Sequence, residues 1–149
     1  MRGTENSAGF SLIELMITLV VIGIIAAIAI PNLVSAIDRG KQKRTLADMR
    51  TIGTAIEAFA VDNSQYPVSS DTATLWVKVS PAYLRPMTQN DGWDHEYVVN
   101  VAATEYTISS TGKDGVPSGC AVGVRTTQFT QDICFSHGSF VQYPEGKQD

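Results

Sequence analysis

The fold is decided by the stretch Gly9-Phe10-Ser11-Leu12-Ile13-Glu14-Leu15, which an apolar run continues as far as Pro31. Between Phe10 and Ile30 the chain has 21 residues, and Glu14 is the one charged residue among them. As a helix this segment would be about 31 Å long, close to the hydrocarbon thickness of a bilayer. Because no face of the helix would be polar, we predict a membrane segment rather than an amphipathic surface helix.

Glu14 is costly in such a segment, by about 2.5 kcal/mol or more if the carboxylate lies near the bilayer centre. The small residues Ala8 and Gly9 come before the apolar run, whereas an ordinary secretory signal has its small-residue cleavage site after the run. Cleavage after Gly9 would leave the anchor on the mature protein. It would also give Phe10 a free α-amino group, a cation one helical turn from Glu14.

These residues resemble the prepilin signature of type IV pilins and type II secretion pseudopilins. The resemblance implies that a prepilin peptidase removes the leader and that Phe10 is then N-methylated. It also implies that Glu14 registers each incoming subunit against the N-terminus of its neighbour. Gly23 and Pro31 fall where many family members carry a helix-weakening pair, and the stretch between them is expected to unwind in a filament. In a helix interior Pro costs about 3 kcal/mol and Gly about 1 kcal/mol.

Charge is unevenly distributed along the chain. The formal net charge is −4, from 11 Lys and Arg against 15 Asp and Glu, which argues against a general nucleic-acid binder. From residue 51 onward there are 5 basic and 11 acidic residues. A basic cluster follows the apolar run, interrupted by two acidic residues, Asp38 and Asp48. Its members are Arg39, Lys41, Lys43, Arg44 and Arg50. The cluster is either a solvated helix face or a stripe that pairs with acidic domains of neighbouring subunits.

The basic cluster also bears on orientation. The resemblance implies a single-pass protein of the bacterial inner membrane whose C-terminal domain lies outside the cytoplasm. The positive-inside rule would instead keep residues 39–44 in the cytoplasm, because they lie within a few residues of the span. We follow the resemblance, because the two cysteines, Cys120 and Cys134, fit a disulfide formed outside the cytoplasm. The basic cluster is a departure from the orientation that the positive-inside rule predicts.

Beyond the anchor, the pattern predicts an α+β fold. Apolar residues recur at three- and four-residue steps from Leu46 to Ala60, so the helix is expected to continue to about Asp62-Asn63. A small antiparallel sheet is expected to pack on it. Residues 97–101 and 106–109 predict a hairpin, residues 122–124 and 133–135 predict edge strands, and residues 75–79 fit a helix or a strand. The predicted parts are a leader, 1–9, a transmembrane or filament-core helix, 10–31, an amphipathic helix half, 32–62, and a β-rich head, 63–149.

The two cysteines, Cys120 and Cys134, have no histidine beside them at metal-ligand spacing. They fit a disulfide, which would form in an oxidising compartment, better than a zinc site, although two reduced thiols remain the alternative. A disulfide that closes a loop of about 15 residues would stabilise the fold by roughly 3 kcal/mol.

A second resemblance lies in the middle of the chain. Asn90-Asp91-Gly92-Trp93 and the stretch from Ser109 to Gly115 are similar to the major pseudopilin of type II secretion, although Gly92 stands where that family usually has Pro. The family binds calcium in the loop after its last paired strands. If that calcium site is carried over to this chain, its ligands would be Asp114 and Asp132, with Ser110 as a third. This chain departs from the family pattern in its cysteine pair, and a disulfide between the two residues could hold this loop in place as calcium does in the family.

Nothing in the sequence predicts catalysis. His95 and His137 stand in no nucleophile or metal motif, and His95 is expected to be exposed in a turn. Gly112-Lys113-Asp114-Gly115 lacks the spacing of a phosphate loop. We therefore expect a structural protein and not an enzyme.

Three functions remain. The chain is expected to polymerise into a pilus-like filament, as the major pseudopilin of a type II secretion system. The alternatives are a pilin of a surface pilus, acting in adhesion, motility or DNA uptake, and an anchored domain that never polymerises. In the first two the expected partners are further copies of the chain, minor pilins or pseudopilins, the prepilin peptidase, and an inner-membrane platform with its ATPase. The filament would be periplasmic or extracellular, and nucleic acid is not an expected partner.

Overall fold

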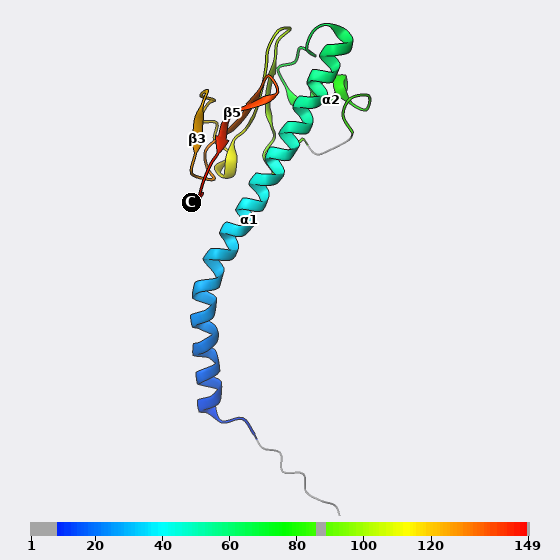
Figure 1. The fold of residues 1–149 in the computed structure, drawn as a ribbon. Coiled ribbons are helices and arrows are strands. Elements are labelled where there is room, and N and C mark those ends of the chain that lie inside the picture. Colours follow the sequence, from blue (N-terminus) through cyan, green and yellow to red (C-terminus); the bar gives the residue numbers. More distant parts are fainter. Residues whose placement is uncertain (1–8, 86–88, 149) are drawn as a thin grey trace, which may run out of the picture. The chain divides into compact units, whose positions relative to one another are not determined.

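The computed structural model describes residues 9–85 and 89–148 (Figure 1). The chain divides into two compact units, residues 1–36 and 37–149. We call the described part of the first unit the anchor and the second unit the head. Residues 1–8 of the predicted leader lie outside the described residues. The boundaries predicted after residue 31, between the filament-core helix and the amphipathic half, and after residue 62, between that half and the β-rich part, remain predictions.

The first helix, α1, runs from Leu12 to Asn63 and contains Pro31 in its interior. The single chain is helical through both Gly23 and Pro31, so unwinding between them stays a prediction about the filament. Next to Pro31, the side-chain amide of Asn32 donates to the carbonyl of Ile28 at 3.1 Å. The helix ends where the sequence predicted.

The head carries a second helix and a five-stranded sheet, which confirms the predicted α+β class. The elements are α2 (Thr72–Val79), β1 (Val98–Val101), β2 (Tyr106–Ser110), the 3-10 turn η1 (Gly112–Asp114), β3 (Val124–Thr126), β4 (Ile133–Ser136) and β5 (Ser139–Pro144). The strand order is β1-β2-β4-β5-β3. All neighbours pair antiparallel except β3 and β5, which are parallel, so the sheet is mixed rather than purely antiparallel.

Several predicted elements are confirmed and others need correction. The β1–β2 hairpin is present, with Val101 opposite Tyr106. Residues 75–79 belong to a helix, whose first turn is capped by the Asp71 carboxylate accepting from the Thr74 N–H at 2.7 Å. The strand β4 is wrongly predicted as an edge, because it lies between β2 and β5. The strand β5 was not predicted at all.

The core forms where the C-terminal half of α1 meets the sheet. Met49, Ile52 and Ile56 are fully buried, as the periodicity predicted. Gly53 lies in the same turns, and a Cβ built on it would come within 2.2 Å of the Phe135 ring on β4. The sheet therefore approaches α1 so closely at this point that only glycine fits without a shift.

Candidate anchoring and assembly sites

Glu14 lies in the first turn of α1, where its side chain makes one half of a capping box. The Ser11 N–H donates to the Glu14 carboxylate at 3.1 Å, and the Glu14 N–H donates to the Ser11 carbonyl at 3.1 Å. This is the S-x-x-E pattern in which a side chain reaches back to satisfy an N-terminal backbone donor. Gly9 and Phe10 precede the helix and are exposed, so the predicted cleavage bond lies in non-helical backbone.

The anchor presents apolar side chains to its surroundings. α1 is long and apolar enough to cross a membrane, and none of its most apolar window is buried within the protein. Leu12 and Ile28, for example, are 75% and 66% exposed. An uninterrupted apolar surface of this length needs lipid or other helices around it.

In the head, Asp38 holds α1 to two loops that are distant in sequence. Its carboxylate accepts from the Trp93 indole N–H at 3.1 Å and from the Lys113 ammonium at 2.8 Å, and the side chain is nearly buried. Burial by itself would raise the pKa of Asp38. The hydrogen bonds from Lys113 and Trp93, with the charges of Lys113 and Lys41, outweigh burial and lower the pKa below its usual value.

The loop before β1 is organised by a second buried carboxylate, Asp91. It accepts from the backbone N–H groups of Trp93 at 2.9 Å and His95 at 3.0 Å, and from the Ser110 hydroxyl at 2.6 Å. The His95 ring in turn contacts the Gly112 carbonyl at 2.9 Å. His95 is therefore half-buried and part of the hydrogen-bonded loop. The prediction that it is exposed was wrong.

Gly92 explains why this loop can approach α1. Its N–H donates to the Thr45 hydroxyl at 2.9 Å, and a Cβ built on it would lie 2.3 Å from the Lys41 carbonyl oxygen. The resembling family usually has Pro here, which has no N–H to donate. The loop is thus seated on the backbone of α1 through a close glycine contact.

The C-terminal loop is fastened by the Cys120–Cys134 disulfide, with Cα atoms 5.8 Å apart, which confirms that prediction. One oxygen of the buried Asp132 carboxylate accepts from the N–H groups of Ser118 at 2.8 Å and Gly119 at 3.0 Å. Gln142 adds a bridge between Ala121 and Asp132. The loop is therefore held to β4 and β5 by a covalent bond and by several hydrogen bonds.

The residues expected to bind calcium do not fit a calcium site. Asp114 is exposed and accepts from the Val116 N–H at 3.1 Å, and Ser110 is engaged with Asp91. Asp132 faces amide N–H groups, whereas calcium requires six to eight oxygen ligands. Its second oxygen is buried without a hydrogen-bond partner in the described chain, which would supply one ligand. No group of three metal-binding side chains occurs within residues 9–85 and 89–148.

Two family models match the chain. The prokaryotic N-terminal methylation motif matches residues 5–30, and the model for protein G of the type II secretion system matches residues 32–125. The chain belongs to the type II secretion protein G family. Members of this family are pseudopilins, so the findings support the pseudopilin interpretation over that of a surface pilin.

Curated relatives agree with this assignment. The chain is 31% identical over 120 residues to a type II secretion system core protein G from Xanthomonas campestris, covering 76% of this chain and 84% of the relative. It is 28% identical to proteins of the same name from Klebsiella michiganensis, over 76% and 88% of the two chains, and from Pseudomonas aeruginosa, over 74% and 89%. No solved structure matches the chain at a significant level.

The cluster around Asp38 was missed by the sequence analysis. Asp38 was counted only as an interruption of the basic cluster, and Lys113 only as part of a failed phosphate loop. The two residues are 75 positions apart, so their pairing depends on how the head folds. The available signal was Asp38, one of two acidic residues in a cluster of five basic ones.

Proposed function

We propose that this pseudopilin polymerises through its anchor helix into the filament of a type II secretion system. The observation that supports this most directly is the fully exposed apolar part of α1, preceded by a methylation motif and followed by a protein G head. The protein would be made as a single-pass inner-membrane precursor with its head outside the cytoplasm. A disulfide in the head suits that oxidising location.

Glu14 would enforce register during assembly. In the single chain its carboxylate caps α1 through the Ser11 N–H, immediately beside Phe10. After cleavage at Gly9, the methylated amino group of Phe10 on a neighbouring subunit would supply a cation for it. In a packed apolar filament core an unpaired carboxylate would cost several kcal/mol, so misregistered subunits would be rejected.

Assembly also requires partners that supply processing and energy. We propose a prepilin peptidase for the cut at Gly9, an assembly platform with an ATPase for extraction from lipid, and minor pseudopilins within the filament. Transfer of an apolar helix out of the bilayer needs work, and no part of the chain's sequence resembles a nucleotide-binding loop.

We further propose that the head is structural rather than catalytic. The closest approach to a catalytic pair in the described residues is the Ser136 hydroxyl, 2.8 Å from His137 Nδ1. That hydroxyl donates to the Tyr106 carbonyl at 2.6 Å, so its proton is already engaged. The arrangement ties a strand end to its neighbour and does not activate a nucleophile.

Mass spectrometry of envelope fractions tests the proposal. Cells expressing the protein at native level would be separated into membranes and sheared surface filaments, and both would be searched for a peptide beginning with N-methylated Phe10. We expect that peptide in membranes only, together with loss of protein secretion on deletion. Abundant Phe10 peptide in the sheared fraction would favour a surface pilus, and an uncut Met1 terminus everywhere would refute both.

Substitution of Glu14 tests the register mechanism in the same cells, with filament yield measured as the cross-linked multimers of the protein in the membrane fraction. Glu14→Ala should still be cut and methylated, yet filament yield should fall at least tenfold, because the cation of a neighbour loses its partner. Thr18→Ala, one turn further along the anchor, serves as the matched control. Normal filament yield from Glu14→Ala would contradict the register role.

A further inference from the structure

The head carries a line of cations on one face of α1. Arg39, Lys43 and Arg50 are spaced at i, i+4 and i+11, which places them within about 60° of one another around a helix of 3.6 residues per turn. Leu46 falls on the same line. All three cationic residues are exposed, and we call them the basic stripe.

The basic stripe is not neutralised within the described part of the chain. Of the nearby acids, Asp38 pairs with Lys113 and Asp48 pairs with Arg44 at 3.4 Å. None of the ion pairs among the described residues includes a member of the stripe. Arg39 and Lys43 are like charges one turn apart, an arrangement that weakens an isolated helix.

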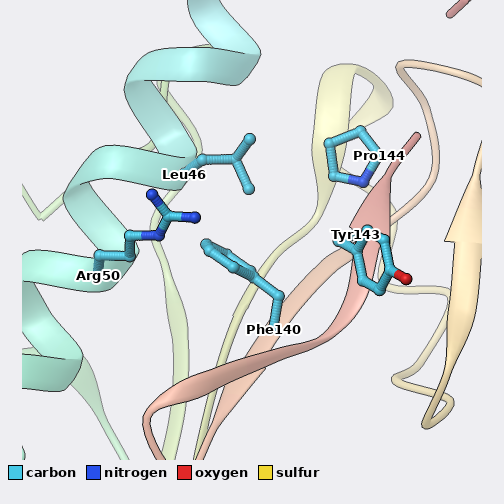
Figure 2. Close-up of a pocket in the computed structure, with 5 residues that line it drawn as sticks. All are labelled: Leu46, Arg50, Phe140, Tyr143 and Pro144. Atoms are coloured by element: carbon cyan, nitrogen blue, oxygen red, sulfur yellow. The ribbon is translucent and has the colours of Figure 1, made fainter. Parts of the chain in front are cut away.

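The stripe ends at a pocket between α1 and β5 (Figure 2). Its volume is about 290 Å³, and its lining residues are Leu46, Arg50, Phe140, Tyr143 and Pro144. The guanidinium carbon of Arg50 lies 5.2 Å from the centre of the Phe140 ring, so the cation is held against an aromatic face at the pocket. Glu145, next to Pro144, pairs with Arg125 at 2.5 Å, which makes it the partner of a different cation.

An apolar pocket with a fixed guanidinium suits a carboxylate on an apolar stem. The rest of the head supplies such groups, since residues 51–149 carry 5 basic and 11 acidic residues, a net −6. Residues 37–50 carry 5 basic and 2 acidic residues, a net +3. Exposed carboxylates lie on the loop before β1, at Asp94 and Glu96, and on the β1–β2 turn, at Glu105.

We propose that the basic stripe and its pocket receive the exposed carboxylates of Asp94 and Glu96, on the loop before β1, of a second copy of this chain. The proposal rests on the proposed filament function and names the contact between the heads of neighbouring subunits that would accompany packing of the anchors. It gives the cations a role outside the cytoplasm, where the positive-inside rule alone would not place them. Opposite charges on the two surfaces of one chain favour a head-to-tail, repeating contact, as a filament requires.

Charge reversal in the full-length protein tests this contact. The variant Arg39→Glu/Lys43→Glu/Arg50→Glu should be processed at Phe10 and folded, with filament yield at least tenfold below wild type. Arg85→Glu, an exposed reversal elsewhere on the head, is the matched control and should leave the yield unchanged. Arg50→Gln, which keeps most of the stem over Phe140, should lower the yield without lowering thermal stability.

Rescue distinguishes a second copy from other partners. Combining the reversed stripe with Asp94→Lys/Glu96→Lys in one chain should restore filaments, because both surfaces then change sign. Wild-type yield from the reversed stripe alone, or no rescue by the combined variant, would overturn the proposal. If the reversed stripe instead lost binding to phosphatidylglycerol-containing vesicles and no head variant rescued assembly, the stripe would be a lipid contact. Wild-type protein that is never cut and never forms filaments would refute the proposed function itself.

Discussion

At the scale of single residues, Asp38 illustrates how one carboxylate organises the head. It is nearly buried, and it binds an indole from one loop and an ammonium from another. A buried carboxylate is stable only while those donors are present, since charged groups carry a large desolvation cost. The same residue therefore locks both loops to α1 and makes the head sensitive to acid.

The pH dependence follows from the lowered pKa of Asp38. Because the folded pKa lies below the unfolded one, the carboxylate contributes stability above about pH 4, and that stability is lost as pH falls through the folded pKa. Asp38→Asn should lower the free energy of unfolding by about 1–2 kcal/mol at pH 7. The difference from wild type should shrink below pH 4.

Denaturant unfolding followed by tryptophan fluorescence would measure this effect, because Trp93 contacts the substituted group. Arg125→Gln is the control: its ion pair with Glu145 is exposed, so its loss should cost about 0.5 kcal/mol or less. An Asp38→Asn variant that differed equally from wild type at pH 3 and pH 7 would contradict the electrostatic account.

At the scale of elements, the packing of β4 on α1 depends on Gly53. Its missing side chain leaves room for the Phe135 ring, which a Cβ would meet at 2.2 Å. Gly53→Val should therefore destabilise the head by about 1–3 kcal/mol through overpacking, even though it removes a poor helix former. Gly40→Val lies on the same helix with open space around its Cβ position, and it should be nearly neutral. Similar melting temperatures for the two variants would show that β4 can shift away from α1.

The elements differ in how far the sequence could predict them. The anchor, the end of α1 and the β1–β2 hairpin follow from local patterns: an apolar run, a Tyr66-Pro67 stop and β-branched residues around a short turn. The strand β5 carries weaker signals, because Ser139-Phe140-Val141 follows a His137-Gly138 turn and the strand ends in Pro144. Its parallel pairing with β3 depends on a non-local connection that local patterns do not encode.

The same distinction applies to the candidate sites. Glu14 could be recognised because its cost in an apolar run is visible in the sequence itself. The disulfide could be proposed because two cysteines stand 14 positions apart in a short C-terminal stretch. The contacts of Asp38 and Asp91 could not be predicted from the sequence, because each carboxylate joins segments that come together only in the folded head.

At the scale of the whole molecule, the head combines the C-terminal part of α1, α2, a mixed sheet and the long segment 115–132 between η1 and β4, in which β3 is the one strand. This segment, the C-terminal loop, is tied back by Cys120–Cys134 and by the amide donors around Asp132. Amide donors facing a carboxylate stabilise its charge without a metal ion. We therefore propose that the head depends on oxidation, and not on calcium, to keep its C-terminal loop in place.

Thermal unfolding of the full chain in detergent distinguishes the two dependences. A calcium chelator should leave the melting temperature unchanged within about 1 °C, because one oxygen of the Asp132 carboxylate already accepts from two backbone amides. Reduction, or Cys120→Ser, should lower the free energy of unfolding by roughly 3 kcal/mol, the value expected for a closed loop of about 15 residues. Asp132→Asn should destabilise the oxidised protein as well, since it removes the charge that the Ser118 and Gly119 amides stabilise. A melting temperature that rose by several degrees with added calcium, and lost this rise in Asp132→Asn, would instead show that the loop rearranges around a metal ion.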